Sequence, residues 1–138
     1  MAKRISWKDV GASKGPTLLS PAFVTSSSSE DLVFTSGCVG TDPKTQELPE
    51  SLEEQTRNAL LNLKIVLEKS GSSMGQVVKV LLFVADSSYA AVVNRVYSEF
   101  FPNSPARSCV VVGFPNERLK MELECVAVAE KRRRWFKL

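Results

Sequence analysis

An almost continuous apolar run at residues 77–85, with Lys79 as its only charged side chain, sets the first requirement on the fold. Such a run indicates a strand that is buried on both faces of a sheet. Side chains alternate between the two faces along a strand. We therefore expect one face to carry Val78, Val80, Leu82 and Val84, and the other to carry Val77, Leu81 and Phe83.

Two amphipathic segments are available to cover this sheet. The first begins with a capping-box pattern, in which Ser51 is the N-cap and Glu54 is placed to reach back, and it ends before Gly71. The second runs from about residue 88 to residue 101 and is terminated by Pro102. Apolar side chains recur in both at three- and four-residue spacing, which predicts two helices with one buried face each.

Further β-rich segments are expected to join the same sheet. Three precede the first helix, at residues 5–10, 18–25 and 32–36, and two follow the second helix, beginning at residues 105 and 121. This order of strands and helices predicts an α+β fold, with a single mixed β-sheet and two helices on one face. The second face of the sheet would then be apolar and exposed in a monomer, and such a patch usually marks an oligomer interface.

Arg107 and Glu122 lie on the last two of these segments, which are joined by a short stretch containing Gly, Pro and Asn. The simplest fold pairs the two segments as an antiparallel hairpin with its loop centred near Pro115. In that hairpin the Arg107 guanidinium lies opposite the Glu122 carboxylate. The pair is either an ordinary cross-strand ion pair, worth about 0.2–1 kcal/mol, or part of a site.

Composition excludes several kinds of protein. The chain has 138 residues, of which 43% are apolar, and we expect one domain at residues 1–130 followed by a basic tail at residues 131–138. No apolar stretch is long enough to cross a membrane, and the basic start does not read as a secretory signal. Cys38, Cys109 and Cys125 lack paired spacing, which argues against disulfides and structural zinc and favours an intracellular, reducing compartment. We expect the cytoplasm, with the mitochondrion as the less favoured alternative.

The absence of histidine excludes Ser-His-Asp and Cys-His catalysis and His-ligated zinc. No glycine-rich phosphate loop is present either, so we expect no nucleotide cofactor. Five of the 18 basic residues lie in residues 131–138, which leaves the rest of the chain at −2. A near-neutral body argues against nucleic-acid binding, and the tail is expected to be a solvated extension, with docking to RNA or an acidic partner as the alternative.

Several blocks along the chain resemble those of the Rid family, also called YjgF, the reactive-intermediate deaminases. The most specific is Pro-Ala-Arg-Ser-Cys-Val at 105–110, and Phe-Thr-Ser-Gly at 34–37, Asp-Pro-Lys-Thr at 42–45 and Val-Asn-Arg-Val-Tyr at 93–97 follow the family's order. The resemblance implies a chorismate-mutase-like fold. It also implies a homotrimer in which three sheets form a central barrel and ligand pockets lie between subunits.

Members of that family hydrolyse 2-imino or enamine acids to 2-keto acids and ammonia, which limits metabolite damage. The resemblance implies the same activity here, that of a 2-iminobutanoate/2-iminopropanoate deaminase, without metal or cofactor, because an imine carbon is already electrophilic. Arg107 would hold the substrate carboxylate, and Glu122 would position and deprotonate water. Ser36, Asn94 and Cys109, the last mainly through its backbone, correspond to further substrate-binding residues.

The sequence departs from the family pattern at Thr17, where the family usually has a tyrosine after Gly-Pro. Thr17 can hydrogen-bond to a ligand but cannot fill the volume of an aromatic ring. This change and the basic tail support an alternative, a non-catalytic relative that binds a small carboxylate, RNA or a protein partner as a sensor, chaperone or translation modulator.

Overall fold

The structure is a computed structural model that describes residues 2–12, 15, 19–25 and 30–130. Its strands are β1 (Lys3–Ile5), β2 (Ala22–Val24), β3 (Asp31–Thr35), β4 (Cys38–Val39), β5 (Val77–Val84), β6 (Ala106–Val111) and β7 (Met121–Ala129). Its helices are α1 (Leu52–Lys69) and α2 (Ala90–Phe100), and two short 3₁₀ turns, η1 (Met74–Gln76) and η2 (Ser87–Tyr89), precede β5 and α2.

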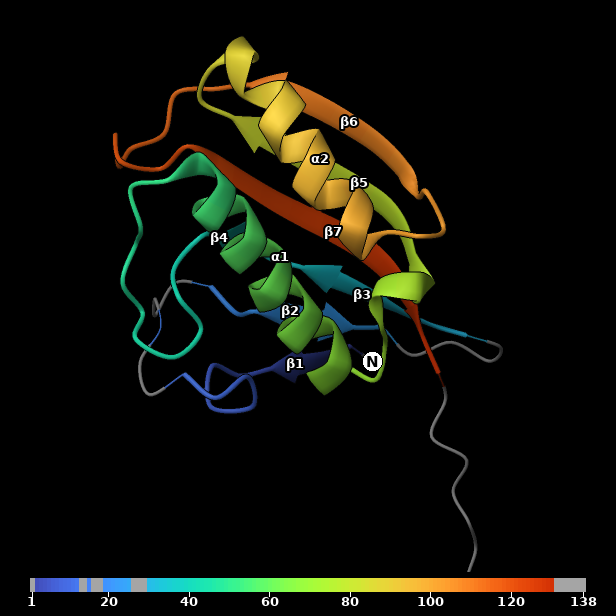
Figure 1. Ribbon diagram of the computed structural model, residues 1–138. Coiled ribbons are helices and arrows are strands. Elements are labelled where there is room, and N and C mark those ends of the chain that lie inside the picture. The colour runs from blue at the N-terminus through green and yellow to red at the C-terminus, as the bar shows by residue number, and fades with distance from the viewer. Residues whose placement is uncertain (1, 13–14, 16–18, 26–29, 131–138) are drawn as a thin grey trace, which may run out of the picture.

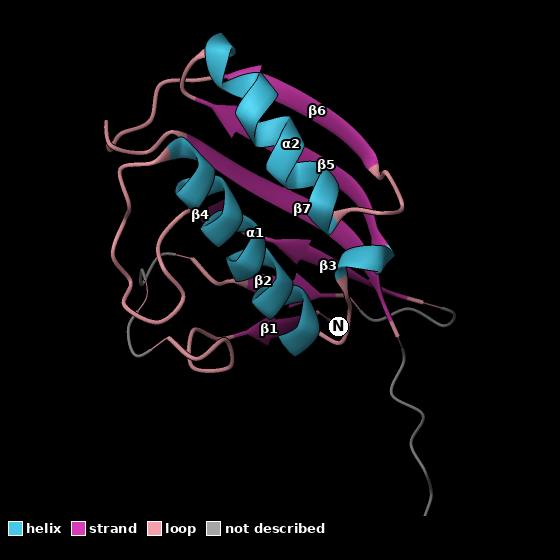
Figure 2. Cartoon of the chain, viewed as in Figure 1, coloured by secondary structure: helices cyan, strands magenta, loops and turns pink. Residues whose placement is uncertain are grey.

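All strands belong to one sheet, in the order β1-β2-β3-β7-β5-β6, with β4 paired to the end of β7. Neighbours are antiparallel except for β5 and β6, which are parallel, so the sheet is mixed. Both helices pack on the same face of it (Figures 1 and 2). The expected α+β architecture, one mixed sheet with two helices on one face, is therefore confirmed.

The predicted hairpin between the last two strands is wrong. β5 lies between β6 and β7, with Val80 aligned to Arg107 on one side and to Cys125 on the other. The helix α2 connects β5 to β6 and supplies the long crossover that parallel neighbours require. β7 then returns antiparallel on the other side of β5, so the most apolar strand takes a central position.

A bulge in β5 changes which of its side chains are buried. The pairing with β7 shifts between Val77 and Lys79, and this irregularity places Val77 in the core and leaves Val78 47% exposed. The alternation we expected from the sequence is therefore wrong at the start of the strand and correct from Val80 onward. Only the helix-covered face of β5 is fully buried, since Leu81 and Phe83 on the other face are half-buried.

The core lies between the sheet and the two helices. Leu60, Leu63 and Leu67 of α1 and Val93 and Val96 of α2 are buried in it. Helix α1 begins as its sequence predicts, because the Ser51 hydroxyl accepts a hydrogen bond from the Glu54 N–H at 3.3 Å. After it ends, Gly71 has a φ of 82°, the left-handed conformation that glycine adopts without strain.

Candidate functional site

The sheet face opposite the helices is the first element of the site. Phe23 and Phe34 are aligned on β2 and β3, and each is exposed by more than two-fifths. Leu81 and Phe83 of β5 lie on the same face, beside Glu124 and Glu122 of β7 respectively. Two carboxylates thus lie among the apolar side chains of a face that neither α1 nor α2 covers.

Glu122 is half-buried on this face and lies against Gly37, where a side-chain Cβ would overlap the carboxylate. Burial raises the pKa of the Glu122 carboxyl above its ordinary value, and the charge of neighbouring Glu124 adds to this. Within the described part of the chain the Glu122 carboxylate has no hydrogen-bond or ion-pair partner. A raised pKa makes such a carboxylate a stronger base than an ordinary glutamate.

Arg107 belongs to β6, the strand at one edge of the sheet (Figure 1), and its contact with α2 places it on the opposite, helix-covered face. It is aligned with the buried residue Val80 and contacts α2, where its Nη1 donates to Asn94 Oδ1 at 2.8 Å. Its Cζ atom lies 4.7 Å from the centre of the Tyr97 ring. No acidic side chain among the described residues forms an ion pair with it.

The expected cross-strand contact between Arg107 and Glu122 is therefore wrong within one chain. Arg107 is aligned with Val80, whereas Glu122 is aligned with Phe83, and the two side chains point to opposite faces. Two strand spacings and three residues along β5 place their Cα atoms about 14 Å apart. A site that uses both groups requires them to come from different copies of the chain.

The other predicted site residues divide between these two regions. Asn94 contacts Arg107 directly, and Cys109 is exposed two residues further along β6, on the same face as Arg107. Ser36 follows β3 and precedes Gly37, so it lies near Glu122 instead. Its hydroxyl donates to the carbonyl of Ser20, which holds two loop segments together. Thr17 lies outside the described residues.

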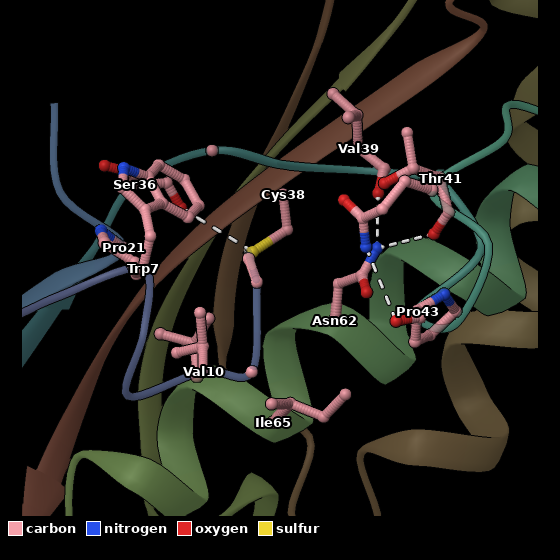
Figure 3. A pocket seen from close by; sticks show the side chains of 15 residues that line it. Trp7, Val10, Pro21, Ser36, Cys38, Val39, Thr41, Pro43, Asn62 and Ile65 are labelled. Carbon is pink, nitrogen blue, oxygen red and sulfur yellow. Dashed lines mark hydrogen bonds between the residues drawn. The ribbon is translucent and has the colours of Figure 1, made fainter. Parts of the chain in front are cut away.

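A cavity of about 140 Å³ lies on the helix side of the sheet, between the N-terminal segment, the turn from β3 to β4, and α1 (Figure 3). Trp7, Val10, Cys38 and Ile65 line it, and the side-chain amide of Asn62 donates to the carbonyls of residues 39 and 41 at 2.9 and 2.8 Å. Burial raises the pKa of the Cys38 thiol to about 12, so this cysteine is not a nucleophile at neutral pH.

The sequence does not predict this cavity, because its walls come from segments far apart in the chain that only the fold brings together. None of the described residues that line it carries a charged side chain. In the described residues no group of histidine, cysteine, aspartate or glutamate side chains could hold a metal ion, and no helix is long and apolar enough to cross a membrane.

Comparison with known proteins identifies the family. The model of the family described as endoribonuclease L-PSP matches residues 18–129. The chain is 35% identical to a 2-iminobutanoate/2-iminopropanoate deaminase of Escherichia coli K12, over 93% of this chain and 98% of the relative. It is 38% identical to a RutC family protein of Haemophilus influenzae, over 83% of this chain and 92% of that protein.

A solved structure has the same fold. The crystal structure of E. coli TdcF with bound serine superposes with a TM-score of 0.77 at 31% identity, covering 93% of this chain and 99% of that one. Relatives named as deaminases of imino acids and of reactive intermediates support a deaminase role at the level of the family. The chain therefore belongs to the endoribonuclease L-PSP family, the YjgF or Rid family that its motifs resemble.

Proposed function

We propose that this protein hydrolyses short-lived 2-imino acids to 2-keto acids and ammonia and thereby limits metabolite damage, with 2-iminobutanoate and 2-iminopropanoate as representative substrates. One observation carries the proposal. The chain presents two groups of complementary chemistry, the Arg107 guanidinium and the Glu122 carboxylate, and neither has an ionic partner among the described residues. A guanidinium binds a carboxylate through paired N–H donors, and a carboxylate of raised pKa accepts a proton from water.

The position of the two groups supports an active site between subunits. Arg107 and Glu122 point to opposite faces of one sheet, so a single chain cannot bring them to the same ligand. We infer a homotrimer in which the apolar open face of each sheet is covered by its neighbours. Arg107 at the β6 edge of one subunit would then reach the Glu122 and Gly37 region of the next.

In this site Arg107 holds the substrate carboxylate, and Glu122 accepts a proton from the attacking water as a bond forms between the water oxygen and the imine carbon. The imine nitrogen takes up a proton. Glu122 then returns its proton to the nitrogen of the resulting carbinolamine, and the C–N bond breaks to release ammonia. The carbinolamine hydroxyl loses its proton to solvent, which leaves the keto oxygen and balances the proton that the imine nitrogen took up from solvent. Cys109 contributes backbone groups, and Ser36 borders the ligand. No metal or cofactor takes part, because protonation of the imine supplies the electrophile.

The test is a coupled assay of keto-acid release while an imino acid is generated in situ by an amino-acid oxidase. Arg107→Lys keeps the charge but loses the planar fork, so we expect kcat/KM to fall by at least tenfold. Arg95→Lys is the matched control, because Arg95 is an exposed arginine of α2 whose Nη2 pairs with Glu53 at 3.0 Å. Equal rates for the wild type and Arg107→Lys would contradict the proposal.

The non-catalytic alternative rests on Thr17 and the basic tail, and both lie outside the described residues. It predicts that the wild type accelerates keto-acid release no more than the Arg107→Lys variant does.

A cytoplasmic location is part of the deaminase proposal, since imino acids form where amino-acid metabolism takes place.

A further inference from the structure

Arg107 is contacted on two sides by side chains of α2. Asn94 and Tyr97 are three residues apart on this helix, which places them on the same face, next to β6. Asn94 accepts a hydrogen bond from Nη1 of the guanidinium, and the Tyr97 ring lies beneath it, with 4.7 Å between Cζ and the ring centre. The Tyr97 ring in turn packs on Phe101, at 4.4 Å between ring centres.

These contacts leave one edge of the guanidinium open. Nη1 is engaged by Asn94, whereas no group in the described part of the chain accepts from Nε or Nη2. Nε and Nη2 form the side-on pair of donors that binds a carboxylate through two parallel hydrogen bonds. One face of the guanidinium is closed by Tyr97, so a ligand can approach only along the open edge or over the opposite face.

We propose that Tyr97, together with Asn94, is a positioning residue that fixes the Arg107 guanidinium with its Nε and Nη2 edge presented to the ligand carboxylate. The inference rests on the proposed function, because it explains how Arg107 binds a 2-imino or 2-keto acid. It also revises the role of Asn94. Asn94, which we expected to bind substrate, accepts a hydrogen bond from Arg107 through its amide oxygen, and in this proposal it acts through the arginine.

The ring of Tyr97, and not its hydroxyl, carries this role. The hydroxyl oxygen is buried and has no hydrogen-bond partner in the described residues. Attraction between a cation and an aromatic face depends on the negative charge of the ring face, and it restricts a side chain that otherwise has many rotamers. A guanidinium that is already oriented loses less freedom when it binds a planar carboxylate.

The experiment measures binding of a 2-keto acid, 2-oxobutanoate, by calorimetry, and kcat and KM for the imino acid. Tyr97→Leu should weaken binding and raise KM by about three- to thirtyfold with little change in kcat, since the carboxylate contact is the same in ground and transition state. Tyr97→Phe should keep wild-type affinity. Tyr89→Leu is the matched control, because Tyr89 lies under Lys120 at 5.5 Å in a similar contact away from Arg107.

Fluorinated phenylalanines at position 97 provide a second measurement that does not depend on how Tyr97→Leu folds. They keep the shape of the ring while progressively removing the negative charge of its face, so affinity should fall step by step with fluorine number. Unchanged affinity across that series would overturn the inference. If the wild type itself binds no 2-keto acid and releases no product, the proposed function fails, whereas wild-type binding with a flat fluorine series contradicts the role of Tyr97 alone.

Discussion

At the scale of single residues, Gly37 and Gly40 can be compared. Gly37 makes room for Glu122, a residue of the proposed site, whereas Gly40 makes room for the backbone of α1, an element of the fold. A Cβ at Gly37 would meet the far end of the Glu122 side chain, which can rotate away. A Cβ at Gly40 would instead meet the backbone of Gln55 in α1, which cannot move without shifting the helix. Neither glycine has a positive φ, so an alanine is tolerated by the local backbone at both positions.

We therefore expect Gly37→Ala to lower deaminase activity with a small effect on stability, because the substitution displaces the Glu122 carboxylate. Gly40→Ala should have the opposite profile, with a loss of about 1–3 kcal/mol in the free energy of unfolding, as for other overpacked sites. Thermal melts and initial rates of both variants give the comparison. Strong destabilisation by Gly37→Ala would show that this glycine serves the fold.

The raised pKa of Glu122 gives a second prediction. The folded state holds this proton at higher pH than the unfolded state does, so the contribution of Glu122 to stability falls as pH rises from about 4.5 towards the folded pKa. Glu122→Gln removes this loss. Its melting temperature should exceed that of the wild type at pH 7, and the difference should vanish below pH 4, where both states of the wild type are protonated.

Thermal melts between pH 3.5 and 8 test this, together with turnover, which should fall by roughly 10²–10⁴ in Glu122→Gln if the carboxylate is the base. A wild type that is more stable than the variant at pH 7 would contradict a raised pKa. A wild type of higher stability would mean that Arg107 of a second copy pairs directly with Glu122 in the empty site.

At the scale of elements, local sequence patterns predicted what depends on neighbouring residues. The Ser51 cap and the ends of α1 follow from residues within a few positions. The order of the strands in the sheet does not follow from such local patterns. The parallel pairing of β5 with β6 depends on where α2 carries the chain, and a short loop before β7 equally suggests a hairpin.

For the candidate site, as for the fold, the sequence predicts the individual parts but not their arrangement. The motif around Arg107 and the carboxylate at Glu122 were identifiable from the sequence, and so was Asn94. Their arrangement was not, because it follows from strand order, which places Arg107 and Glu122 on opposite faces of the sheet. The role of Tyr97 is not predictable from the sequence, since the helical spacing that buries a ring in a core is the same spacing that places this ring under Arg107.

At the scale of the whole molecule, the open face of the sheet determines how copies of the chain associate. Leu81 lies near its centre, aligned with Glu124 on one side and Ser108 on the other. Leu82 is the next residue along β5 but is 1% exposed and lies under the helices. The two leucines are thus a matched pair, one on the proposed interface and one in the core.

Leu81→Glu should dissociate the proposed trimer into folded monomers, because a third carboxylate beside Glu122 and Glu124 would be buried without a partner in the assembly but hydrated in the monomer. Leu82→Glu should unfold the chain, since its carboxylate has no route to water. Light scattering gives the mass and circular dichroism the fold of each variant. A wild type with the mass of one chain would refute the trimer, and a Leu81→Glu variant that retains the wild-type mass would show that copies associate through another surface. Folded monomers should also lose deaminase activity, because Arg107 of one copy no longer reaches Glu122 of the next.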